Sequence, residues 1–131
     1  MCLLNKILLL LFIFSCSSSK IVWEKNEYAS YKSVEEGDQY FLQGDYNRAL
    51  EKFSNAAHLY PKIKSKYEYL VRLVKTYGEL NDNNKIKNLK IHINTLQLNN
   101  KNLEIYHYMM GKVHYYLSNK IKMKYHYNEA L

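Results

Sequence analysis

The stretch that decides the fold is residues 37–61, GDQYFLQGDYNRALEKFSNAAHLYP. It contains two helix signals on either side of a turn, because Gly44 is suited to end one helix and Asp45 to cap the start of the next. The part after this turn carries apolar side chains at i, i+3, i+4 and i+7 spacings, which predicts one buried helical face. Pro61 then ends the second helix, because proline lacks the backbone N–H that a helix interior needs. The stretch therefore predicts a helical hairpin.

The spacing of small, aromatic and proline residues in this stretch resembles the tetratricopeptide repeat, a helix–turn–helix unit of about 34 residues. Small residues let the two helices of such a unit approach closely, and the aromatic residues pack between them. The signature positions of the family are matched by Gly37, Tyr40, Gly44, Tyr46, Ala49, Phe53, Ala56 and Pro61. The resemblance implies that residues 30–63 form the first repeat of a stack.

Two further repeats are expected from the same pattern. The second covers residues 64–103, with a glycine at its turn and an insertion of six residues before its second helix resumes the pattern. This insertion sets the start of the third repeat, which covers residues 104–131. The resemblance thus implies an all-α fold: a short right-handed α-solenoid of about three helix–turn–helix repeats over residues 30–131. The remaining signature residues are Gly78, Gly111, Tyr127 and Ala130.

The first residues of the chain have the pattern of an exported protein. Lys6 precedes an apolar run that is shorter than the roughly 20 residues a membrane-spanning helix needs, and small polar residues follow. We therefore predict a signal peptide over residues 1–15. The residues IFSC, which end at Cys16, resemble the lipobox of bacterial lipoproteins, and this implies that Cys16 becomes the acylated (palmitate-bearing) start of the mature chain, with residues 16–29 as a tether. A plain signal peptide, in which Cys16 has no role, is the alternative.

In the tetratricopeptide family the first helices of successive repeats line a concave groove that binds extended peptides or helices. The corresponding positions here predict a groove with a basic middle and apolar or aromatic ends, which suits a peptide with aromatic side chains and a carboxylate. A second interpretation also stands, in which the tyrosines pack between repeats. The predicted groove residues are Tyr31, Val34, Asp38, Phe41, Leu42, Ser65, Glu68, Arg72, Lys75, Thr76, Ile105, Tyr108, Lys112, Tyr115 and Tyr116.

Charge is distributed unevenly along the chain, whose formal net charge is +7. Residues 20–60 carry five Lys/Arg against seven Asp/Glu, whereas residues 61–131 carry thirteen against five. A basic half is compatible with an anionic membrane surface, an acidic protein partner or nucleic acid, and a solvated lysine-rich exterior is the plainer interpretation. The export signal argues against nucleic acid, so we expect no nucleic-acid partner.

No enzyme signature occurs in the sequence, which has no phosphate-binding loop, no HExxH and no CxxC. His107 and His114 are seven residues apart and so lie on one helical face, where they could act as metal ligands. The repeat pattern makes His114 a packing residue instead. We therefore expect no catalysis, no metal and no cofactor.

The lipobox and the opening repeat together resemble BamD (YfiO), the lipoprotein family of the outer-membrane β-barrel assembly machinery. The resemblance implies a non-enzymatic scaffold, lipid-anchored in the outer membrane and facing the periplasm, that binds envelope proteins or peptides such as barrel-assembly subunits. Typical members have about five repeats, so this chain is shorter. The alternative is a general periplasmic or surface lipoprotein that binds other envelope or host proteins. The sequence leaves the oligomeric state open.

Overall fold

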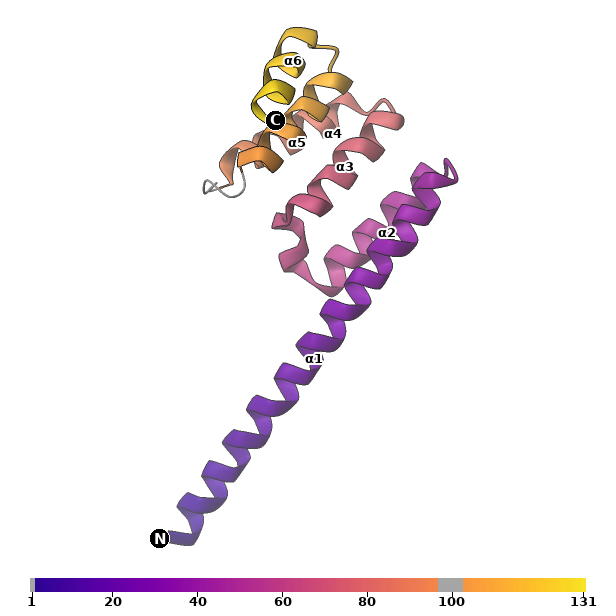
Figure 1. Ribbon diagram of the computed structural model, residues 1–131. Helices are drawn as coiled ribbons and strands as arrows, with labels where there is room; N and C mark the ends of the chain where they lie inside the picture. Colours follow the sequence, from indigo (N-terminus) through magenta and orange to yellow (C-terminus); the bar gives the residue numbers. More distant parts are fainter. Residues whose placement is uncertain (1, 97–102) are drawn as a thin grey trace.

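The computed structural model describes the backbone of residues 2–96 and 103–131, and the side chains of residues 22–96 and 103–131. The described residues form helices joined by turns and contain no strand (Figure 1). The predicted all-α fold is therefore confirmed. Its elements are α1 (Cys2–Leu42), α2 (Tyr46–Leu59), the 3-10 helix η1 (Pro61–Ser65), α3 (Tyr67–Glu79), α4 (Asn83–Thr95), α5 (Leu103–Tyr116) and α6 (Lys120–Glu129).

The helices pack in pairs along the chain: α1 with α2, α3 with α4, and α5 with α6. Helix α3 joins these pairs, because it also packs on α2, on α5 and on part of α1. Figure 1 shows the resulting order, with the first pair at one end of the body and α6 at the other.

The three helix pairs are closed by the same kind of turn, repeated every 37 residues. The last residue before each capping position has a positive φ, of 79° at Gly44, 57° at Asn81 and 57° at Ser118. Glycine adopts this left-handed conformation without strain, and asparagine tolerates it better than most residues. The capping residues that follow are Asp45, Asp82 and Asn119, whose side chains accept hydrogen bonds from the backbone N–H groups of Arg48, Lys85 and Lys122.

The sequence places Gly78 at the second turn, and this prediction is wrong. Gly78 is buried inside α3, and the turn lies three residues later, at Asn81. The extra residues lie in a different place from the predicted one. The helix η1 lengthens the connection from α2 to α3, and α4 then starts at Asn83 without the predicted six-residue insertion. In the described part of the chain α5 begins at Leu103, and the predicted start of the third repeat is residue 104.

Most of the first repeat's signature residues make the close contacts that the pattern predicts. Ala49, Phe53 and Ala56 are all fully buried on α2. Gly37 lies so close to the Phe53 ring that an added Cβ would be 2.5 Å from it. In the third pair, Gly111 meets the ring of Tyr127 in the same way, at 2.4 Å. The other signature residues are the half-buried Tyr40 and Tyr46, Pro61 at the start of η1, and the half-buried Ala130 at the end of α6.

The core consists of two hydrophobic clusters that meet at α3. The first fills the space between α1, α2, η1 and α3, and the second fills the space between α3, α4 and α5. Helix α6 contributes no buried residue to either cluster. The buried members are Val34, Ala49, Phe53, Ala56, Ala57, Ile63 and Tyr69 in the first cluster, and Leu70, Val74, Ile86, Ile93, Met109, Met110 and Val113 in the second.

The expected tether, residues 16–29, is helical, because α1 runs without a break from Cys2 to Leu42. Its last turns are already docked: the Trp23 ring contacts Tyr60 edge to face at a centroid distance of 6.3 Å, and Lys62 lies over the same ring. Within the described residues no helix has both the length and the apolar character needed to cross a membrane. The predicted signal peptide and the Cys16 side chain lie outside the residues whose side chains are described.

Candidate peptide-binding site between α1 and α3

Two adjoining hollows lie between α1 and α3, with volumes of about 360 Å³ and 480 Å³. They share Glu68 and Arg72 of α3 as lining residues, so together they form one surface, which we call the α1–α3 groove. The two hollows are lined by Tyr31, Val34, Asp38, Phe41, Leu42, Ile63, Lys66, Glu68, Tyr69, Val71, Arg72, Lys75 and Ile105.

Nine of the predicted groove residues lie around this surface, although they come from three different helices. They are Tyr31, Val34, Asp38, Phe41, Leu42, Glu68, Arg72, Lys75 and Ile105. Of the remaining six, Thr76 lines a smaller hollow next to Asp38 and Phe41, and Ser65 is exposed at the end of η1. The other four, Tyr108, Lys112, Tyr115 and Tyr116, lie on α5.

Two of the four α5 residues, Tyr108 and Tyr116, pack against neighbouring helices, as the second interpretation predicts. Tyr116 lies against Gly78 of α3, and its hydroxyl donates to Glu79 at 3.1 Å. Tyr108 contacts Tyr127 of α6, at a ring-centroid distance of 6.4 Å. Lys112 lies over the Tyr108 ring, and Tyr115 is 58% exposed. The α5 residues are therefore partly used by the fold itself.

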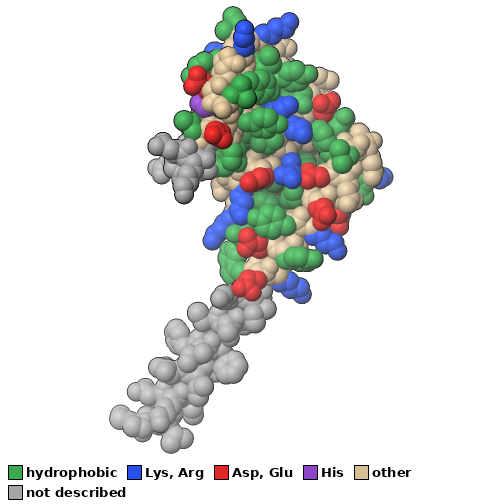
Figure 2. Space-filling view, in the orientation of Figure 1, with side chains coloured by type: hydrophobic (Ala, Val, Ile, Leu, Met, Phe, Trp, Pro, Cys, Tyr) green, Lys and Arg blue, Asp and Glu red, His purple; other side chains and the backbone are tan. Residues whose placement is uncertain are grey.

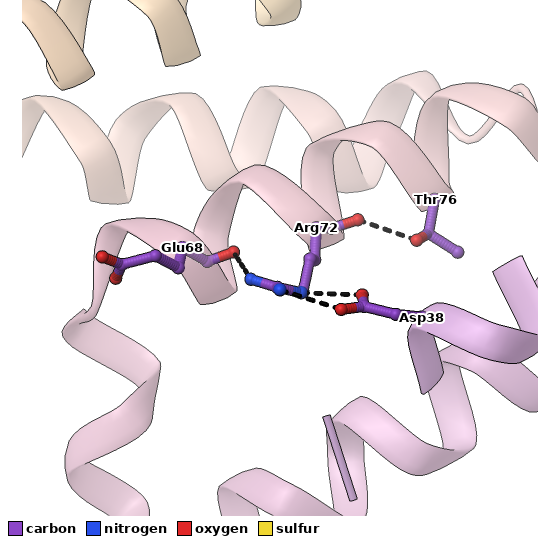
Figure 3. Close-up of polar contacts among 4 residues, drawn as sticks. All are labelled: Asp38, Glu68, Arg72 and Thr76. Atoms are coloured by element: carbon purple, nitrogen blue, oxygen red, sulfur yellow. Dashed lines mark hydrogen bonds and ion pairs between the residues drawn. The ribbon is translucent and has the colours of Figure 1, made fainter. Parts of the chain in front are cut away.

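The middle of the groove is not basic in the way the sequence predicts, because Arg72 is paired. Its Nε and one terminal nitrogen donate to the two carboxylate oxygens of Asp38 at 2.7 Å and 2.8 Å, and the other terminal nitrogen donates to the Glu68 carbonyl at 3.0 Å (Figure 3). Figure 2 likewise shows acidic and basic side chains interspersed with hydrophobic ones on the face in view. The predicted carboxylate-binding role of Arg72 is thus replaced by an ion pair that joins α3 to α1.

Lys75 supplies the positive charge in the larger hollow. Its ammonium lies 5.3 Å from the centre of the Phe41 ring, a cation–π contact, and it makes no ion pair with the described carboxylates. Apolar side chains surround it: Leu42 is 85% exposed, and Ile105 is 37% exposed. This hollow therefore offers an apolar surface beside one cation.

The hollow that Tyr31 and Val34 line also contains a hydrogen-bonded group around Lys66. The Lys66 ammonium donates to the Tyr31 hydroxyl and lies 3.9 Å from the Glu27 carboxylate. The hydrogen bond to Tyr31 raises the pKa of Lys66. Beside it, the Tyr69 hydroxyl donates to the Phe53 carbonyl at 3.0 Å, and burial raises the pKa of Tyr69 to about 12. Both side chains stay protonated at neutral pH and hold η1 and α3 against the first pair.

Four lining residues were not predicted from the sequence: Ile63, Lys66, Tyr69 and Val71. The 37-residue spacing of the turns would have identified Val71, which lies 37 residues after Val34. Ile63 lies in η1, Lys66 directly follows η1, and Tyr69 lies in the first turn of α3. The 34-residue frame does not predict η1, so it does not place these three residues in the groove.

No group of three or more His, Cys, Asp or Glu residues in the described part of the chain is arranged to hold a metal ion. Comparisons with protein-family models, with curated proteins and with solved structures give no match. The candidate function therefore rests on the groove and on the sequence patterns.

Proposed function

We propose that this chain is a non-enzymatic scaffold of the bacterial cell envelope that binds a partner protein or peptide in the α1–α3 groove. The observation that supports it most is that residues chosen by the tetratricopeptide pattern, from three separate helices, line two adjoining hollows that share Glu68 and Arg72. The repeated turns at 37-residue intervals support the finer fold, a short right-handed solenoid of three such repeats.

The chemistry of the larger hollow suggests what the partner presents. Phe41, Leu42, Val71 and Ile105 form an apolar surface, and Lys75 is the adjacent cation. A peptide segment that places an apolar or aromatic side chain next to a carboxylate, as a chain terminus does, complements both features. Because Arg72 is held by Asp38, the carboxylate is assigned to Lys75 alone.

The lipobox around Cys16 supports the proposed location, with an acyl anchor in the outer membrane and the groove facing the periplasm. In this setting the partner is an envelope protein, and the resemblance to BamD makes subunits or substrates of barrel assembly the first candidates. A general envelope or surface lipoprotein with another protein partner is the alternative. Metabolic labelling with a palmitate analogue tests the anchor, because Cys16→Ser should abolish incorporation.

The groove is tested by cross-linking pull-downs from cells, comparing two variants with the same charge change. Lys75→Glu should reduce capture of the partner at least tenfold, because it opposes the carboxylate at the groove. Lys87→Glu, on the exposed side of α4, should leave capture unchanged. Equal capture by both variants would move the site elsewhere. Depletion of the chain separates the two candidate roles, since only the barrel-assembly role predicts a fall in outer-membrane proteins.

A further inference from the structure

Three histidines lie together where α6 packs on α5. His107 and His114 are on α5, and His126 of α6 lies between them. The Nδ1 atoms of His107 and His126 are 3.0 Å apart, and the rings of His114 and His126 are stacked, with centroids 5.4 Å apart and planes at 7°. His126 thus contacts both histidines of α5 at once.

This geometry allows at most one of His107 and His126 to be charged. A 3.0 Å contact between two Nδ1 atoms is a hydrogen bond only if one carries a proton and the other accepts it, so charging both rings would set two donors against each other. His114 is 3% exposed, and its Nδ1 has no hydrogen-bond partner in the described part of the chain. A charge on His114 would therefore be desolvated.

Nearby charged side chains also favour the neutral forms of His114 and His126. Lys90 of α4 and Lys122 of α6 oppose a positive charge on both His114 and His126, while Glu129 of α6 partly offsets this at His126. Burial, together with these lysines, lowers the pKa of His114 to about 4 and also lowers the pKa of His126. Two nearby lysines also disfavour a divalent cation, so the proton is the ligand that this cluster is suited to sense.

Helix α6 contributes no buried residue to the core, so its docking depends on side chains that stay partly exposed. Besides the histidine pairs, its aromatic contacts with α5 are Tyr125 against His107, His126 against Tyr106, and Tyr127 against Tyr108.

We propose that the histidine cluster is an acid-sensitive latch that releases α6 from α5 as the pH falls. A released histidine has the ordinary pKa of about 6.5, whereas docked His114 and docked His126 bind protons more weakly. Docking is therefore fully stable above about pH 6.5 and is lost as the pH falls from there toward about 4, where docked His114 itself would protonate. The latch does not depend on the proposed partner function.

Hydrogen exchange of the full chain in detergent micelles, followed by mass spectrometry and corrected for intrinsic rates, tests the latch. Protection of residues 120–129 should fall at least tenfold between pH 7.5 and pH 5.0, whereas protection of α2 should stay constant. An unchanged protection of α6, or a parallel loss in α2, would overturn the proposal.

Two variants identify the residues responsible. The double variant His114→Phe/His126→Phe keeps both aromatic rings but removes both protonation sites, so protection of α6 should no longer respond to pH. His92→Phe, at an exposed histidine of α4, should respond as the unmodified chain does. A double variant that still releases α6 at pH 5.0 would refute the latch.

Because phenylalanine at 114 and 126 could itself loosen α6, an NMR titration of the unmodified chain provides a second reading. His114 and His126 should titrate below the ordinary pKa of histidine, and the midpoint of His126 should coincide with the loss of α6 protection. Titration of both at the ordinary pKa of histidine would contradict the proposal, whatever the variant does.

Discussion

The first and last helix pairs have the same backbone design but different interiors. Both close with a left-handed residue followed by a side-chain cap, and both bring a glycine against an aromatic ring. In the first pair the ring is Phe53, which is fully buried, whereas in the last pair it is Tyr127, which is only partly buried. The turn and the close approach therefore set the geometry of a pair, and the side chains inside set how firmly it holds.

Polar groups show the same contrast. In the first pair the hydroxyls of Ser30 and Ser33 donate to the carbonyls of Ala56 and Lys52, both at 2.9 Å, so the polar atoms between the helices are satisfied whatever the pH. In the last pair this place is taken by histidines, whose hydrogen bonding depends on protonation. We infer that the first pair is permanent and that the last is conditional.

The largest expected difference comes from removing the aromatic rings. Phe53→Ala should lower the free energy of unfolding by about 3–5 kcal/mol, because it opens a cavity in the fully buried first cluster. Tyr127→Ala should cost less than half as much, because its ring is only partly buried and α6 has no buried residue. Urea unfolding followed by circular dichroism measures both, and equal losses would remove the distinction between the pairs.

A smaller difference is expected from filling the two glycine contacts. Gly37→Ala should destabilise the chain by about 1–3 kcal/mol, because the Phe53 ring is enclosed and cannot move aside. Gly111→Ala should cost less, since the partly buried Tyr127 ring can move outward. Thermal unfolding of the two variants compares them directly, and a larger loss at Gly111 would show that the last pair is the more tightly packed one.

The smallest effect concerns the ion pair that fixes the first pair to α3. A double-mutant cycle of Asp38→Ala and Arg72→Ala should give a coupling of about 0.5–1 kcal/mol, since both side chains are about one-third exposed to solvent. The Lys52–Glu36 pair, of similar exposure, is the control, and its single contact should couple less strongly than the two-pronged one. A coupling of zero at Asp38–Arg72 would mean that hydrophobic contacts alone hold α3 against α1.

How far the sequence predicts this molecule depends on the region. The first pair is predictable because Gly37, Ala49, Phe53 and Pro61 each report a local constraint, a close approach or a helix end. The second turn is not, because Asn81 adopts there the conformation for which glycine is the usual signal. The pairing of Arg72 with Asp38 is also beyond sequence reasoning, because it depends on how α3 lies against α1.

The histidine cluster illustrates the same limit. The sequence shows that His107 and His114 share a helical face, but His126 joins them only through the packing of α6 on α5. The spacing of 37 residues between turns would have improved the prediction, since it gives the register of all three pairs and adds Val71 to the groove.

The central claim, that the α1–α3 groove at the first pair binds the partner, is tested most directly by a photo-crosslinking amino acid placed at two positions of equal exposure. Leu42 lies at the groove and Ile121 lies on α6, and each is 85% exposed. We predict that irradiation of cells captures a discrete envelope protein from position 42 but not from position 121, and that Lys75→Glu abolishes this capture. Capture from position 121 alone, or capture from position 42 that Lys75→Glu leaves intact, would contradict the account.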